Sequence, residues 1–286
     1  MKRVIQSLDT TYMTAERAAL ILPIAALSAV FLQEYGYHNV IYTDAAGARL
    51  LSGVPYAEVK AVLDTRPSTV AGQQLVAEAK MFALRREGTG VAHVDYDVML
   101  MSTDLLDAFY NHECDAIVNC LDMNAKETIS AMQWMNGIYV PDRLRNSEAL
   151  PTYNTGVLGF NDVSLMSDVL DTYYDIYEHY QDMHNPYWTD LVAEQYAMYR
   201  ISTERNANVM RVISTTFHPT KFEWFNAEER RKGFKHLWGS DKEKRHIQSW
   251  VWNKLQSLRP ELAEVIKQRI YKINKQINEY NNGNNK

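Results

Sequence analysis

The chain alternates between two patterns of apolar residues. Short apolar runs bounded by polar or turn residues predict strands, at 4–8, 39–44, 88–100, 115–121, 153–160 and 209–216. Apolar residues that recur every three or four positions predict helices, at 18–35, 73–86, 104–110, 127–135, 163–181 and 190–201. A turn is expected at 45–48, Thr103 and Asp162 are candidate helix caps, and the segment 55–63 fits either a strand or a helix. Strands that alternate with helices indicate an α/β fold.

The pattern becomes entirely helical beyond residue 241. One helix is expected at 246–258, and Pro260 stands where a proline is favoured, at the first position of a helix. An apolar stripe then continues to Tyr280, followed by a polar tail at 281–286. We therefore divide the chain into an α/β domain at 1–240 and a C-terminal helical extension at 241–286 that packs on it.

Composition narrows the class of protein. The 286 residues are 46% hydrophobic, which is enough to bury a substantial core. A net charge of −5 gives no general basic field, so nucleic acid is excluded as a partner, and an anionic substrate would need local positive charge or a metal. The two cysteines do not indicate a disulfide framework. The apolar stretch 18–32 contains Pro23 and is shorter than the ~20 residues of a spanning helix, so it predicts a buried helix in a soluble protein.

Two acids, Asp95 and Asp97, follow an apolar approach within 88–100. In a strand, residues i and i+2 point to the same side, so both carboxylates can face one ligand. Hard divalent cations prefer such oxygens, and Mg²⁺ or Mn²⁺ is commonly shared between carboxylates and substrate phosphates. The alternative is two solvated aspartates at a turn. Their position after a buried-looking strand favours a metal site.

Two further segments carry polar residues that suit a substrate pocket. Gly156 lies inside the strand predicted at 153–160, beside Asn154, where it allows close approach of a ligand or only tight packing of the sheet. Asp190 and Glu194 share one face of a helix, and Glu194 stands among apolar residues. Glu194 could orient an acceptor hydroxyl or stabilise a positively charged transition state. An ordinary helix-surface acid is the alternative.

The densest basic stretch of this acidic chain lies near the end of the α/β domain. A neutral histidine, His236, can complete a metal shell begun by carboxylates. Gly239 lets the backbone approach a phosphate, and Lys242 supplies a point charge. The neighbouring basic residues are Arg230, Arg231, Lys232, Lys235, Lys244 and Arg245. The stretch suits a diphosphate leaving group, and a solvated basic loop is the alternative.

Four motifs together resemble a known family. Asp95-Tyr96-Asp97 looks like the Asp-x-Asp motif of GT-A glycosyltransferases, and the segment 154–158 resembles the Asn-Ala-Gly-Val strand of the glycogenin and lipopolysaccharide-galactosyltransferase family. Glu194-Gln195 resembles that family's Asp-Gln pair, and the segment 236–242 is similar to its His-x-x-Gly-x-x-Lys motif. The motifs occur in the family's order. Glu243 stands where the family has Pro-Trp, which indicates a distant bacterial branch.

The resemblance implies a fold and an activity. The fold is GT-A, with a single mixed sheet flanked by helices. The activity is metal-dependent transfer of a sugar from a nucleotide-diphospho-sugar, with a UDP-sugar favoured, to a hydroxyl of a glycan or other acceptor, in the cytoplasm or at the inner membrane surface. The resemblance also implies a role for each site residue. Asp95, Asp97 and His236 would hold Mn²⁺ or Mg²⁺, and Gly239 and Lys242 would face the diphosphate. Asp44 and Lys80 would contact the nucleotide, Asn154 and Gly156 would line the sugar site, and Glu194 and Gln195 would be catalytic.

Other functions predict other features. A sugar nucleotidyltransferase needs a glycine-rich loop near its N-terminus, and 1–14 contains no glycine. A non-catalytic carbohydrate- or nucleotide-binding domain of the same fold would use the aromatic residues to stack sugars. A helical scaffold built on the C-terminal helices would bind no nucleotide. Metal-dependent nucleotide binding separates the transferase from a carbohydrate-binding domain and from the scaffold.

Overall fold

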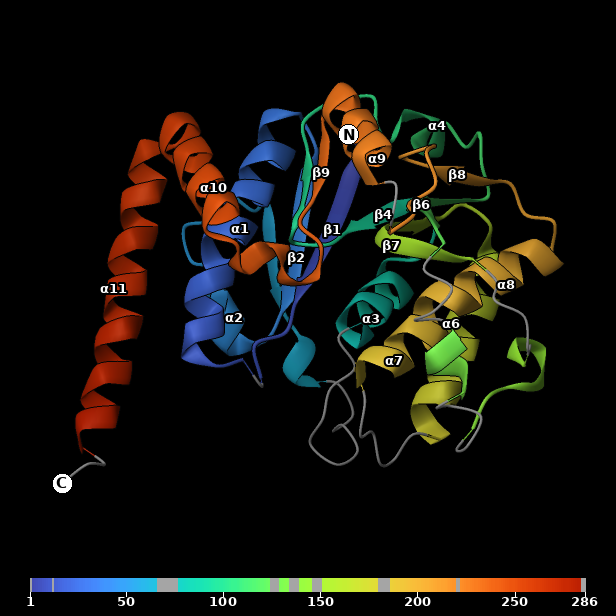
Figure 1. The fold of residues 1–286 in the computed structure, drawn as a ribbon, viewed down its shortest axis with the longest axis horizontal. Helices are drawn as coiled ribbons and strands as arrows, with labels where there is room; N and C mark the ends of the chain where they lie inside the picture. Colours follow the sequence, from blue (N-terminus) through green and yellow to red (C-terminus); the bar gives the residue numbers. More distant parts are fainter. Residues whose placement is uncertain are drawn as a thin grey trace.

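The computed structural model contains one seven-stranded mixed sheet with helices on both faces (Figure 1). It describes residues 2–11, 13–65, 77–123, 129–133, 139–145, 151–179, 186–219 and 222–283. The strand order is β3-β2-β1-β4-β7-β6-β8, and β5 and β9 form a separate antiparallel pair. The strands are β1 (Arg3–Leu8), β2 (His38–Thr43), β3 (Glu58–Ala61), β4 (Val91–Val94), β5 (Val98–Leu100), β6 (Ala116–Asp122), β7 (Thr152–Phe160), β8 (Val209–Arg211) and β9 (Phe234–His236).

The direction of the strands decides where a ligand site can form. β1 is parallel to both β2 and β4, and β4 and β6 are each antiparallel to β7. The carboxyl ends of β1, β4 and β6 therefore meet at one edge of the sheet, together with the start of β7. The chain fills positions on one side of β1 with β2 and β3 and then crosses to the other side with β4. Such a switch in strand order opens a crevice at the carboxyl edge, where α/β proteins bind ligands.

The alternation of side chains in the strands supports helices on both faces. Ile5 packs into a core cluster with α3 (Glu78–Glu87), α6 (Val163–His179) and α8 (Ala197–Glu204), whereas its neighbour Val4 packs against α1, β5 and β9 on the opposite face. The other helical segments are α2 (Ala45–Leu50), α4 (Asp107–Tyr110), α7 (Pro186–Asp190), α9 (Phe222–Lys232), the 3-10 turns η1 (Leu63–Thr65), η3 (Asp142–Leu144) and η5 (Gly239–Glu243), and the π-helix η4 (Leu191–Tyr196).

α1 (Ala15–Glu34) is the central helix of the second face. It is apolar all round, as expected of a helix enclosed by protein, and its residues 21–32 are all buried. By length and composition alone it is also apolar enough to cross a membrane, but 67% of its most apolar window is buried inside the protein. Thr14 caps its first turn by accepting a hydrogen bond from the Arg17 N–H at 3.2 Å. The prediction of a buried helix here is confirmed.

The C-terminal part is helical, as predicted. α10 (Arg245–Leu258) and α11 (Pro260–Gly283) both contact α1 and each other (Figure 1). Leu255 and Ile266 are fully buried in the same core cluster as the apolar side of α1. The division of the chain at residue 240 stays a proposal, because these helices share the core of the α/β part.

Three local predictions were wrong. The expected turn at 45–48 is the helix α2, because Asp44 caps it by accepting a hydrogen bond from the Gly47 N–H at 2.8 Å. The expected strand at 88–100 is two strands in different sheets, separated by a turn at Asp95–Asp97. Thr103 caps no helix, since α4 begins only at Asp107 and its first turn has no side-chain cap.

The remaining differences concern extent. The strand predicted at 209–216 covers only β8, and the open segment 55–63 contains β3. The helix predicted at 127–135 is helical at 129–133, and its other residues lie outside the described part of the chain, as do 73–76 and 180–181 of two further predicted helices. Sequence reasoning missed α9 and β9 altogether.

Ile266→Ala tests the packing of the C-terminal helix. The side chain is fully buried against the α1 cluster, so its loss should lower the free energy of unfolding by about 2–5 kcal/mol in urea denaturation. Val265→Ala is the matched control on the same helix, because Val265 is 45% exposed, and it should change stability by less than about 0.5 kcal/mol. Equal effects of the two substitutions would contradict this packing.

Candidate active site

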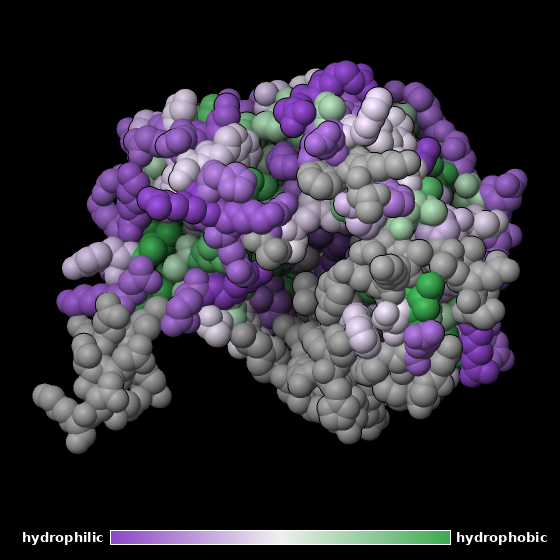
Figure 2. Space-filling view, viewed as in Figure 1, coloured by the Kyte–Doolittle hydropathy of each residue, from purple (hydrophilic) through white to green (hydrophobic). Residues whose placement is uncertain are grey.

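A cavity of about 550 Å³ lies at the carboxyl edge of the sheet. Figure 2 shows a hollow lined by hydrophilic residues near the middle of the face drawn. Its walls come from strand ends, from α3 and η4, and from the segment that follows β9. The polar lining residues are Ser7, Lys80, Asp95, Tyr96, Asp97, Asp122, Asn154, Thr155, Asp190, Glu194, Gln195, His236, Asp241 and Lys242.

The turn that carries Asp95 and Asp97 is anchored on both sides by the backbone. The Asp95 N–H donates to the Gly156 carbonyl of β7 at 2.8 Å, and the Leu237 N–H donates to the Asp97 carbonyl at 3.0 Å. A third hydrogen bond, from the Val98 N–H to the Asp95 carbonyl at 2.9 Å, closes the turn itself. The two acids therefore reach the cavity because a tight turn joins β4 to β5, and the strand geometry assumed from the sequence was wrong.

Asp95, Asp97 and His236 form a cluster suited to a metal ion. Each offers one ligand atom, and these atoms lie within 4.8 Å of one another. Within the described part of the chain, the buried Oδ1 of Asp97 has no hydrogen-bond partner, and Nε2 of His236 lies 3.5 Å from it. Burial lowers the pKa of His236 to about 4, which leaves the imidazole neutral at pH 7, as metal coordination requires. Two carboxylate oxygens and one imidazole nitrogen fit Mn²⁺ or Mg²⁺.

Two buried lysines compensate the acids of the cluster. Lys80 Nζ lies 2.9 Å from Asp95 and 2.7 Å from Glu194, and Lys242 forms a close ion pair with Asp97. Burial raises the pKa of Asp95, and the neighbouring carboxylates of Asp97 and Glu194 raise it further. Lys80 lowers this pKa, but the net shift is upward. Burial also raises the pKa of Asp97, but Lys242 and His236 outweigh it, so the net shift is downward. The two carboxylates thus differ in proton affinity because each has its own charged neighbours.

Among the described residues that line the cavity, carboxylates outnumber ammonium groups. They are Asp95, Asp97, Asp122, Asp190, Glu194 and Asp241 against Lys80 and Lys242, and Asp241 is itself paired with Lys244. A bound cation would lower the repulsion that an anionic ligand meets from these carboxylates. A divalent ion at the Asp95–Asp97–His236 cluster would reverse this balance locally, because bound cations are the largest charges in such sites.

Position 156 must be a glycine because the His236 ring lies too close to leave space for a side chain. A Cβ at this position would lie 2.6 Å from Cε1 and 2.9 Å from Nδ1 of His236, closer than side-chain atoms approach. Asn119 also contacts the ring, with its amide nitrogen 3.2 Å from Nδ1. The same amide donates to Oδ1 of Asn154 at 2.7 Å. Gly156 and Asn154 were predicted to line a sugar site, and in the structure both also lie against the residues that position His236.

Glu194 and Gln195 lie in the π-helical turn η4, between α7 and α8. π-helical turns are rare and often stand at functional sites, because the widened turn redirects side chains. Here both residues line the cavity, Gln195 half-buried and Glu194 buried. Lys80 also donates to the Thr155 carbonyl at 2.9 Å, so the Lys80–Glu194 pair connects α3, β7 and η4 around the cavity.

The other predicted site residues divide into two groups. Lys242 and Gly239 line the cavity, and Gly239 adopts a φ of 42°, which favours glycine. Asp44 is not among the lining residues, since its carboxylate caps α2 and accepts two hydrogen bonds from Thr10. Of the basic residues between 230 and 245, only Lys242 reaches this cavity.

Several lining residues were missed from the sequence. Asp122 ends β6, Ser7 lies near the end of β1, and Phe217, Trp238 and Asp241 come from the segments around β9. The positions of Asp122 and Ser7 at strand ends were the available signal. No pattern in the sequence identified the contact between the rings of Phe217 and Trp238, because the two residues are 21 positions apart and meet only in the folded chain.

The fold and cavity define an α/β protein with a carboxylate–imidazole cluster at a topological switch point. Residues 18–269 match DUF6734, which is described as a family of unknown function, and the chain belongs to that family. No curated protein matches the chain.

Several solved structures are similar in fold. They include the galactosyltransferase LgtC in complex with donor and acceptor sugar analogs (13% identity, TM-score 0.45, covering 92% of this chain and 99% of that chain). Mouse xyloside xylosyltransferase 1 shares 14% identity at a TM-score of 0.42, covering 82% of this chain and 97% of that chain. The glycosyltransferase GlyE of Streptococcus pneumoniae TIGR4 shares 12% identity at 0.42, covering 98% of this chain and 64% of that chain. All three are glycosyltransferases, and the likeness concerns the fold alone.

Gly156→Ala should weaken metal binding without unfolding the protein. The added methyl must displace the His236 ring, so the affinity for Mn²⁺, measured by electron paramagnetic resonance of the free ion, should fall by about ten-fold or more. In a His236→Ala background the same change should have no further effect, because the displaced ligand is already absent. Additive losses in the double variant would contradict a role through His236.

Proposed function

We propose that this chain is a metal-dependent glycosyltransferase that uses a nucleotide-diphospho-sugar, a UDP-sugar in the first instance, and transfers the sugar to a hydroxyl of a glycan or other acceptor. The observation that carries the proposal is the Asp95–Asp97–His236 cluster inside a cavity where, among the described lining residues, carboxylates outnumber ammonium groups. A diphosphate donor would bind there together with a divalent cation, which is how these donors are usually bound.

The residues of the cluster have distinct tasks in this proposal. Bound Mn²⁺ or Mg²⁺ supplies Lewis-acid stabilisation of the negative charge on the departing nucleoside diphosphate. Lys242 stands beside Asp97 and is buried enough to act on that charge in a poorly solvated site. Gly239, three residues earlier, leaves space for a phosphate, since no atom lies within 4 Å of where its Cβ would be.

The opposite wall would hold the sugar. Asn154 and Gly156 face the cavity from β7, and Glu194 and Gln195 face it from η4. Lys80 already occupies one carboxylate oxygen of Glu194 at 2.7 Å, which favours a role for Glu194 in positioning and charge stabilisation. An inverting reaction would instead require its carboxylate as the base. Asp44 stays a predicted nucleotide contact, and its capping of α2 gives it a structural role as well.

A bacterial, cytoplasmic setting is part of the proposal. Both Cys114 and Cys120 are buried and free, which fits a reducing compartment. The competing function is a non-catalytic carbohydrate- or nucleotide-binding domain with the same fold. It shares the cavity but has no need of the paired acids or of a neutral histidine beside them.

Thermal shift with UDP, GDP, CDP and dTDP, each with and without Mn²⁺, tests the donor site. Stabilisation by one nucleotide only with metal present is expected, since the carboxylates repel the diphosphate otherwise. Asp97→Asn should abolish this stabilisation and any transfer, because Oδ1 of Asp97 is the free ligand oxygen of the cluster. Asp171→Asn, at an exposed ion pair with Arg85, is the control and should behave like wild type. If Asp97→Asn is stabilised by nucleotide and metal as much as wild type, the metal assignment is wrong. If a nucleotide binds without metal, the non-catalytic binding domain is favoured.

Glu194→Gln tests the catalytic assignment separately from binding. Loss of the carboxylate removes one partner of the buried Lys80 pair beside the proposed sugar site, so kcat for transfer or donor hydrolysis should fall by about 10²-fold or more. Metal-dependent stabilisation by the nucleotide should persist, because Glu194 is outside the metal cluster. Equal loss of both properties would instead indicate that the Lys80–Glu194 pair only maintains the fold of the site.

A further inference from the structure

A second cavity, of about 760 Å³, adjoins the first. Phe217, Trp238 and Asp241 line both cavities, so the two share a wall. The shared wall is an aromatic stack: the rings of Phe217 and Trp238 lie 4.5 Å apart and nearly parallel, and Phe225 meets Trp238 edge-on at 5.8 Å. A molecule in the second cavity would therefore lie beside the proposed transfer site, across the wall that Phe217, Trp238 and Asp241 share.

The interior of the second cavity is mainly apolar. Its apolar lining residues come from α9, β9 and α10 and from the segments that precede α9 or follow β5 and β9: Met101, Phe217, Phe225, Phe234, Leu237, Trp238, Ile247 and Trp250. One polar contact connects this cavity to the metal cluster. Glu229, which lines the second cavity, accepts a hydrogen bond from the backbone N–H of His236 at 3.3 Å. Surface of this composition binds hydrocarbon or aromatic groups by excluding water.

The rim of this cavity has the opposite charge to the first. Lys235 is paired with Glu229 at 2.8 Å, and Lys244 is paired with Asp241. Arg230 and Lys254 also line the cavity, and neither has an ion-pair partner within the described part of the chain. Two exposed cations are thus left uncompensated in a chain whose net charge is −5. They are complementary to an anionic group.

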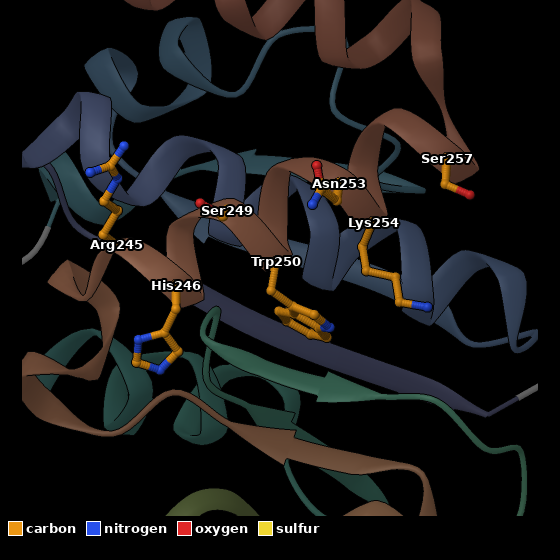
Figure 3. Close-up of a pocket in the computed structure, with 7 residues that line it drawn as sticks. All are labelled: Arg245, His246, Ser249, Trp250, Asn253, Lys254 and Ser257. Atoms are coloured by element: carbon orange, nitrogen blue, oxygen red, sulfur yellow. The ribbon is translucent and has the colours of Figure 1, made fainter.

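One face of α10 carries part of this wall. His246, Trp250 and Lys254 are spaced four residues apart, and Figure 3 shows their side chains projecting from the same side of the helix. All three also belong to a wider surface hollow along α10. The second cavity is therefore open toward solvent along this helix, so that a long molecule can extend outward from it.

We propose that the second cavity is the acceptor subsite and that the acceptor is an anionic amphiphile. Its apolar chain or ring would fill the cavity against Phe225 and Trp250, and its anionic group, such as a phosphate, would pair with Arg230 and Lys254. The inference rests on the proposed transferase function, because only the adjacency of the first cavity makes an occupant of the second an acceptor. A neutral glycan would stack on the aromatic rings but leave both cations unpaired.

Calorimetric titration with a monomeric amphiphile tests this subsite. Dodecyl phosphate, kept below its micelle concentration, is compared with dodecyl maltoside and inorganic phosphate on the full chain. Arg230→Glu/Lys254→Glu should weaken dodecyl phosphate binding by about ten-fold or more, because charge-assisted contacts are lost. Asn226→Trp, which fills the cavity from α9, should abolish it. Lys272→Glu, a charge reversal of the same sign and half the size on an exposed side chain of α11, is the control and should bind like wild type.

The outcomes separate this inference from the proposed function. Preferential binding of dodecyl phosphate, lost in the cavity variants but not in the control, supports the subsite if metal-dependent nucleotide binding is present in the same proteins. Equal affinity for dodecyl maltoside overturns the anionic class. Equal binding of dodecyl phosphate by all variants overturns the subsite even when nucleotide binds. Amphiphile binding without any nucleotide response overturns the acceptor role together with the proposed function.

Discussion

The confinement of like charges at the carboxyl edge of the sheet is the constraint on which the rest of the site depends. Asp95 and Asp97 are held in one turn, and backbone hydrogen bonds to Gly156 and Leu237 prevent the turn from moving to separate them. Carboxylates enclosed in this way must be compensated, because burial of an unpaired charge is expensive. Lys80 and Lys242 supply part of this compensation within the described part of the chain.

The compensation also ties the layers of the fold to the site. Lys80 comes from α3, Glu194 from η4 and Thr155 from β7, and they meet within hydrogen-bonding distance in the interior. Breaking a buried pair by removing one partner typically costs about 3–5 kcal/mol, because it leaves the other charge unpaired. The helices that cover this face of the sheet are therefore positioned by the electrostatics of the cavity as well as by apolar packing.

Sequence reasoning succeeded where one local signal was enough. β1, β2, β6 and β7 were predicted because strands buried on both faces read as continuous apolar runs. α9 was missed because its charged residues obscure a stripe that buries Phe225, and β9 was missed because three residues give no period. The Asp95–Asp97 pair was identified by its chemistry, but it was predicted to lie in a strand and lies in a turn. A turn of three residues between two short apolar strands gives the same sequence pattern as one long strand. The partners of a fold-dependent contact, such as Gly156 and the His236 ring, cannot be paired from sequence alone.

The two neighbouring cavities differ in the charge and polarity of the residues that line them. The first concentrates negative charge and so suits a cation with its diphosphate, whereas the second combines apolar surface with unpaired cations. Placed side by side across Phe217 and Trp238, they would hold two anionic molecules without direct repulsion, because each anion meets its own cation. Glu229 links the two sides, since it lies in the second cavity and binds the backbone of His236. In the proposed arrangement, this shared aromatic wall would place an acceptor beside a donor while it keeps the charged ends of both apart.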